Sequence, residues 1–134
     1  MDRGRLLGII LGLFLLTSVF VLPFAYRGAR PLTLFEVSVV VTQYMTYIPS
    51  EFLPRNYSYL AAFALLLAAG VLGMHPPVSG AVALLAMASL SVVAYAQGAP
   101  NWGFGYYLIW GEALAAFTNG YITRQNARRA PDRS

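Results

Sequence analysis

The sequence contains no cysteine and no lysine, and only 10% of its 134 residues are charged. The absence of cysteine excludes disulfides, thiolate nucleophiles and Cys-ligated metal or iron–sulfur sites. A soluble domain carries about 25% charged residues, so this chain has too few charges to cover a surface that faces water. The low charge content therefore predicts a protein whose surface mostly contacts a lipid bilayer.

The sequence also lacks the motifs of common enzymes and of nucleic-acid-binding proteins. It has no phosphate-binding glycine loop, no nucleophile elbow and no cluster of histidine and carboxylate side chains. Its single histidine, His75, stands beside two prolines without a second metal ligand nearby. The net charge of +4 comes from the two ends of the chain and forms no basic stripe with interleaved aromatic residues. We therefore expect no enzymatic activity, catalytic residue, metal, cofactor or nucleic-acid partner.

Apolar residues make up 58% of the chain and gather in four long runs. A helix of about 19 residues is about 28 Å long, close to the thickness of the hydrocarbon core. The first run follows a positively charged start, as in a signal peptide, but it is longer than an apolar signal region. We predict a single all-α membrane domain, a four-transmembrane-helix bundle, with spans at residues 6–24, 57–74, 78–96 and 104–122.

The longest predicted connection, residues 25–56, contains an amphipathic segment between two prolines. Within residues 32–48, apolar side chains recur at helical spacing, and Glu36 and Gln43 fall on another face. This pattern favours a helix that lies in the membrane interface or packs over the ends of the spans. The valine-rich part of the segment is equally typical of a β-strand, and its length would also allow a fifth crossing.

The arginines predict the orientation of the chain. Four spans place six arginines on the side of both termini and three on the other side. Because positively charged segments flanking the spans favour the cytoplasm, we expect a multi-pass protein of the cell membrane with both termini cytoplasmic. The polar tail at residues 123–134 would lie on the same side. Aromatic residues at the outer boundary are the expected interface anchors: Tyr57, Trp102, Tyr106 and Tyr107.

Two polar residues fall inside the last predicted span. Asn119 follows Glu112 by seven positions, so both side chains lie on one face of the helix. A charged group at the centre of a span costs about 2.5–3.5 kcal/mol on insertion scales, so such groups usually have a partner or face water. The residues therefore either hold helices together by hydrogen bonds or form a proton or cation relay through Glu112.

Small residues recur at intervals of four in the first two spans. Glycines four apart allow another helix to approach closely, because no side chain separates the two backbones. The neighbouring helix would belong either to this chain or to a partner. The predicted helix-packing residues are Gly4, Gly8, Gly12, Ala69 and Gly73.

Together these features predict a small, non-catalytic structural or accessory subunit of a larger integral membrane complex. By analogy, an energy-transducing complex of the respiratory type would be a natural setting, with the lipid bilayer and other integral membrane subunits as partners. One alternative is a self-associating small transporter or channel, with Glu112 and Asn119 lining the path. Another is a quinone- or lipid-binding membrane protein that uses the aromatic and glycine-rich segment at residues 101–107.

Overall fold

The computed structural model describes residues 3–27, 29–44, 53–97 and 101–129, and most of these residues are helical. This confirms the prediction of a mainly helical chain. In chain order the elements are α1 (Arg3–Val21), β1 (Ala25–Arg27), β2 (Arg30–Leu32), α2 (Leu34–Tyr44), α3 (Leu53–Val71), the short 3-10 helix η3 (Leu72–Met74), α4 (Pro76–Gln97), β3 (Asn101–Trp102) and α5 (Phe104–Arg129).

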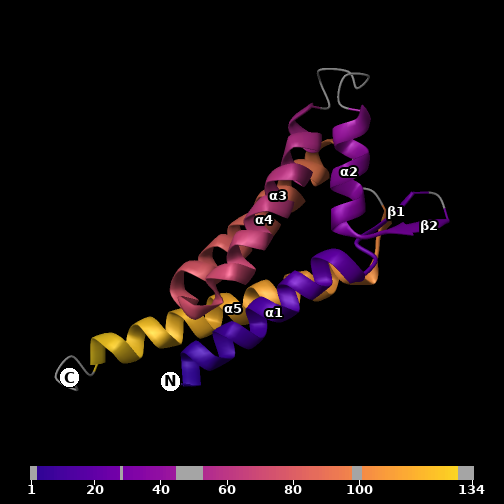
Figure 1. The fold of residues 1–134 in the computed structure, drawn as a ribbon. Coiled ribbons are helices and arrows are strands. Elements are labelled where there is room, and N and C mark those ends of the chain that lie inside the picture. Colours follow the sequence, from indigo (N-terminus) through magenta and orange to yellow (C-terminus); the bar gives the residue numbers. More distant parts are fainter. Residues whose placement is uncertain (1–2, 28, 45–52, 98–100, 130–134) are drawn as a thin grey trace.

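The four long helices pack as neighbours in the order α1, α3, α4, α5, and α5 packs against α1 again. Figure 1 shows two pairs, α1 with α5 and α3 with α4, which diverge away from the end at which η3 lies. Helix α2 stands in the opening between the pairs and packs mainly against α3. Fully buried apolar side chains from the four long helices form the core between them: Leu15, Leu66, Met87, Leu90 and Ile109.

Three helices are long and apolar enough to cross a membrane, over Arg3–Val21, Asn56–Met74 and Pro76–Ala96. These helices indicate a membrane protein and coincide with the first three predicted spans. Helix α5, with 26 residues, is the longest of all but is not among the three. Its polar residues Glu112 and Asn119, together with several tyrosines and glycines, lower its apolar character. The fourth span predicted at residues 104–122 is therefore not among the helices that are long and apolar enough to cross a membrane.

Two helices extend beyond the predicted limits. Helix α5 continues to Arg129, so most of the polar tail predicted at residues 123–134 is helical, and residues 130–134 lie outside the described part. Helix α3 begins at Leu53, inside the predicted connection. Its first turn includes Pro54, which a helix accepts there because the N–H groups of the first turn have no intrahelical acceptor.

The amphipathic segment forms helix α2 rather than a β-strand, so the strand alternative is wrong for the valine-rich run. The helix begins with reciprocal hydrogen bonds: the Glu36 backbone N–H donates to Thr33 Oγ1, and the Thr33 N–H donates to Glu36 Oε1, both at 3.1 Å. This capping box satisfies two backbone donors and determines where the helix starts. Residues 45–48 of the predicted segment lie outside the described part, in which α2 has 11 residues.

A small antiparallel sheet, which the sequence analysis did not predict, joins the end of α1 to the start of α5. The strand order is β2-β1-β3, with Ala25 opposite both Leu32 and Trp102. Two further backbone bonds extend the junction, from Gly103 N to Phe24 O at 2.8 Å and from Gly105 N to Pro23 O at 2.7 Å. The sheet therefore fixes the positions at which α1 ends and α5 begins, which aligns the two helices.

Candidate functional site

Glu112 of α5 is joined to α1 by a short hydrogen bond. The Ser18 hydroxyl donates to Glu112 Oε1 at 2.6 Å, and the Ser18 side chain is buried. The distance is at the short end of the range for O–H···O hydrogen bonds. The partly buried carboxyl group of Glu112 therefore has a partner inside this chain, on the neighbouring helix.

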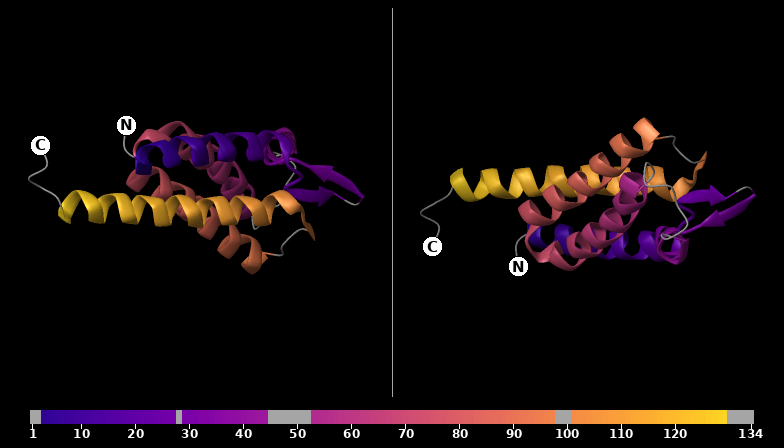
Figure 2. Two further views of the ribbon diagram at one scale, coloured as in Figure 1. Left: turned by 90° about the horizontal axis from the view of Figure 1, so that it is seen from below. Right: turned by 90° about the horizontal axis from the view of Figure 1, so that it is seen from above.

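Asn119, the second polar residue of the predicted span, also binds α1. Its Nδ2 donates to the backbone carbonyl of Gly4 at 2.9 Å, and the Asn119 side chain is buried. Gly4 lies near the start of α1 and Ser18 near its end, so the two bonds show that α1 and α5 run antiparallel. Figure 2 shows the two helices side by side, with the first turn of α1 and the last turns of α5 at the same end.

The second oxygen of Glu112 has no such partner. Glu112 Oε2 is buried and makes no hydrogen bond in the described part of the chain. Within that part, no group of three or more histidine, cysteine, aspartate or glutamate side chains could hold a metal ion. The site is thus a single carboxyl group in the α1–α5 interface, with one bonded and one unbonded oxygen.

A second polar cluster joins α4 to α5. Ser91 Oγ lies 2.7 Å from the Tyr106 hydroxyl and accepts a 3.1 Å hydrogen bond from Trp110 Nε1. Because the polar ends of both aromatic side chains are satisfied by one serine, their rings can be buried or half-buried against α4. These bonds position the first turns of α5, which also carry the predicted interface anchors.

The predicted aromatic anchors fall into two groups. Tyr57 and Tyr107 are exposed, as anchors in the lipid headgroup region would be. Trp102 and Tyr106 stack on each other, with ring centroids 3.9 Å apart, and Phe24 packs edge-on against both. The ring faces that Trp102 and Tyr106 turn toward each other are therefore closed to a ligand.

Two glycines of α1, Gly8 and Gly12, face glycines of α3 and η3 in the same chain. A Cβ at Gly12 would lie 2.5 Å from the Gly70 carbonyl oxygen, and one at Gly73 would lie 2.6 Å from the Gly8 carbonyl oxygen. The backbones are therefore too close for any side chain to fit between them. Ala69, also a predicted packing residue, is fully buried, and its carbonyl oxygen accepts a 2.7 Å bond from the Ser79 hydroxyl of α4.

Sequence reasoning missed Ser18, Ser91 and the capping box. The Thr33-Leu34-Phe35-Glu36 pattern is a recognisable capping signature and would have located the start of α2. No comparable local signal marks Ser18 or Ser91, because serine is common in apolar spans and the partners lie 94 and 15 residues away.

Comparisons with protein-family models, curated proteins and solved structures find no match for this chain. The protein is therefore described by its own structure. It is a mainly helical chain with three candidate membrane-spanning helices and a polar, hydrogen-bonded interface between α1 and α5.

Proposed function

We propose that this chain is a small, non-catalytic accessory subunit of a larger integral membrane complex. The proposal is supported by the contacts that the two polar residues of α5 make. Glu112 and Asn119 each bond to α1, so they hold two helices of this chain together.

We further propose that α5 is a fourth crossing, with both termini on the cytoplasmic side. Helix α5 lies antiparallel to α1, a candidate span, and is hydrogen-bonded to it near both ends of α1. A helix so aligned with a membrane span lies at the same depth in the bilayer. The arginines of both elements then fall on one side: Arg3, Arg5, Arg124, Arg128 and Arg129.

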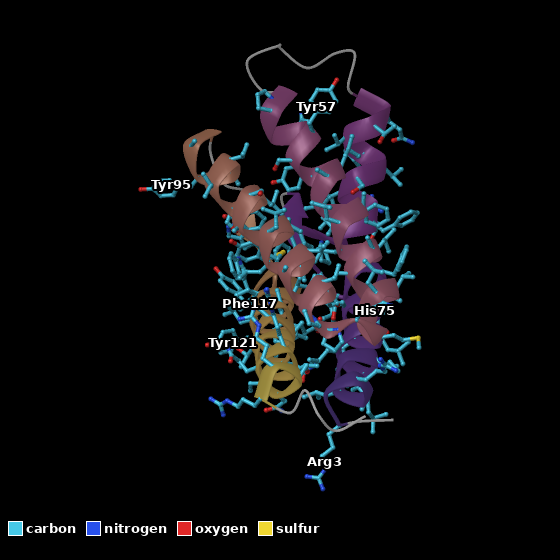
Figure 3. All side chains as sticks on the ribbon, turned by 90° about the vertical axis from the view of Figure 1, so that its left-hand side faces the viewer. Arg3, Tyr57, His75, Tyr95, Phe117 and Tyr121 are labelled. Carbon is cyan, nitrogen blue, oxygen red and sulfur yellow. The ribbon has the colours of Figure 1, made fainter. Side chains whose placement is uncertain are left out.

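The outer face of α5 supports a role in assembly. Leu114, Phe117 and Tyr121 are exposed, and Figure 3 shows Phe117 and Tyr121 pointing away from the bundle. Gly111 lies between them and Tyr107 along the helix, and a Cβ placed there would meet nothing within 4 Å. A neighbouring membrane helix could approach the α5 backbone closely at this point. Energy-transducing complexes of the respiratory type are the first assemblies in which to look for that neighbour.

The test is native mass spectrometry of the protein after gentle extraction from its own membrane. Co-migrating chains in a fixed ratio are expected, and their identities would name the complex. A homo-oligomer containing this chain alone would contradict the subunit proposal.

A second candidate is a self-associating transporter or channel whose path includes Glu112 and Asn119. The observation that favours it is the buried, unbonded Oε2 of Glu112, which could exchange a proton. The variant Glu112→Gln keeps the size of the side chain but cannot release a proton. If the candidate is correct, proton flux into liposomes should be lost while the variant remains assembled. Equal flux for the variant and the unchanged protein would exclude this candidate.

A further inference from the structure

The α2–α3 interface contains a groove that is separate from the α1–α5 site. The groove has a volume of about 300 Å³, at the lower limit for small-molecule sites. Figure 1 shows α2 and α3 side by side along this interface. The lining residues on α2 recur at helical spacing and so form one face, opposite two residues of α3: Phe35, Ser38, Val39, Thr42, Gln43, Leu60 and Phe63.

Aromatic rings form one wall of the groove. The rings of Phe35 and Phe63 have centroids 5.8 Å apart, and Phe20 of α1 packs against both, at 5.3 and 5.9 Å. Phe35 is 43% exposed, so part of its ring surface is available to a ligand. Aromatic rings prefer offset-stacked or edge-to-face contact with another ring, so this wall suits a planar, apolar molecule.

One buried polar group in the groove lacks a partner. Ser38 lines the groove, its side chain is 5% exposed, and its Oγ makes no hydrogen bond within the described part of the chain. Its own backbone carbonyl, in contrast, accepts a 2.8 Å bond from the Thr42 hydroxyl. A buried hydroxyl without a partner carries a desolvation cost, which a ligand with a hydrogen-bond acceptor would remove.

The depth of the groove in the bilayer limits which molecules could bring a hydrogen-bond acceptor to Ser38. Leu60 and Phe63 lie four and seven residues beyond Asn56, where the candidate span of α3 begins. This places Phe63 about 10 Å along the helix axis from Asn56, in the outer part of the hydrocarbon core of a membrane that α3 crosses, and Leu60 at the edge of that core. The ester carbonyls of phospholipids lie at the edge of that core, whereas the ring of a bilayer-soluble compound can reach this depth.

From these observations we propose that the α2–α3 groove binds a quinone, a planar ring with carbonyl oxygens and an apolar tail. The ring contacts Phe35 and Phe63, and the Ser38 hydroxyl donates a hydrogen bond to a ring carbonyl. The tail leaves past Val39 and Leu60 into the lipid. This binding site is independent of the proposed subunit role and requires only that α3 crosses the membrane.

The experiment uses the full chain in phosphatidylcholine nanodiscs and a photoreactive azido-benzoquinone with a short isoprenoid tail. Labelling is measured against probe concentration, and the labelled peptides are identified by mass spectrometry. We expect saturable labelling of α2 and α3. Leu60→Trp, which fills the groove, should abolish it, and Ser38→Ala should raise the half-saturating concentration about 3- to 10-fold.

Two matched variants on α4 serve as controls. Leu85→Trp and Ser89→Ala make the same chemical changes at exposed positions outside the groove, so labelling should be unchanged. Phe35→Ala, which removes an exposed wall of the groove, replaces Leu60→Trp if that variant does not fold. Labelling that does not saturate, or that no groove variant alters, would overturn the proposal. So would a co-purified phospholipid that Leu60→Trp displaces, together with absent quinone labelling.

Discussion

At the scale of single residues, serine hydroxyls join neighbouring helices through hydrogen bonds to side chains and to the backbone. Ser18, Ser79 and Ser91 each bond to a group on a neighbouring helix. In an apolar environment an unpaired polar group costs free energy, and water is not available to pair with it. Each of these serines therefore stabilises one particular arrangement of two helices.

Ser18→Ala should destabilise the fold by about 1 kcal/mol, in the range measured for hydrogen bonds between membrane helices. The variant leaves both oxygens of Glu112 without a described partner. The measurement is equilibrium unfolding in mixed micelles with increasing sodium dodecyl sulfate. Ser89→Ala, at an exposed position on α4, is the control and should change stability by less than about 0.5 kcal/mol.

A double variant isolates the Ser18–Glu112 interaction. If the hydrogen bond exists, Ser18→Ala and Glu112→Ala together should cost less than the sum of the two single variants. Strict additivity of the two changes would show that the residues do not interact.

At the scale of helices, close backbone contact depends on glycines that face backbone atoms of another helix. A Cβ at Gly80 would lie 2.7 Å from the Ala116 backbone carbon, and a Cβ at Gly120 would lie 2.5 Å from the Pro76 carbonyl oxygen. Like the α1 contacts with Gly70 and Gly73, these contacts join helices of this chain. Gly111 differs, because nothing lies within 4 Å of its Cβ position.

Gly12→Ala should destabilise the protein by about 1–3 kcal/mol, as overpacking does, because the added methyl group meets the Gly70 backbone. Gly111→Ala makes the same chemical change at an open position. It should leave stability unchanged or raise it by up to about 1 kcal/mol through helix propensity. Thermal unfolding in detergent compares the two, and equal effects would contradict the close approach of α1 and α3.

Helix α2 depends on its N-terminal cap, since it is short and its partner surface is on α3. Thr33→Ala removes the acceptor of the Glu36 N–H and should cost the helix about 1 kcal/mol. Faster hydrogen exchange of backbone amides in the first turn of α2 is the expected readout. Thr17→Ala on α1, where the hydroxyl bonds only to the preceding turn, is the control. Unchanged exchange in α2 would show that the cap does not hold the helix.

At the scale of the whole molecule, the fold brings the two ends of the described chain together. The Asn119–Gly4 bond and the antiparallel course of α1 and α5 place Arg3 and Arg128 at one end. Figure 3 shows Arg3 at the end opposite Tyr57. The small sheet holds the other ends of α1 and α5 together.

The absence of native cysteine allows a direct test of topology, because every introduced cysteine is the only one. Arg3→Cys, His75→Cys and Arg128→Cys should react with a membrane-impermeant reagent from the cytoplasmic side, and Tyr26→Cys and Asn101→Cys from the other. Labelling in inverted and right-side-out vesicles distinguishes the sides. Labelling of Arg128→Cys together with Asn101→Cys would mean that α5 does not cross.

Much of the fold could be predicted because apolar runs and prolines are local signals. The helices at α1, α3 and α4 follow from uncharged runs, and the break after Met74 follows from Pro76 and Pro77. The helix predicted within residues 32–48 is confirmed over Leu34–Tyr44, and its start is encoded in Thr33 and Glu36, whereas Leu32 belongs to β2. The place of β3 in the sheet could not be predicted, since its pairing joins Ala25 to Trp102 across most of the chain.

Composition and local pattern account for a helical chain, three apolar helices of membrane length, and a polar pair on one face of α5. Packing of the helices settles which groups that pair contacts, which glycines meet, and that Ser38, beside a groove, has no partner among the described residues. The physical reason is the distance along the sequence over which each interaction acts. Helix propensity and hydrophobicity act through neighbours in sequence, whereas a hydrogen bond between Ser18 and Glu112 exists only once two distant helices are packed.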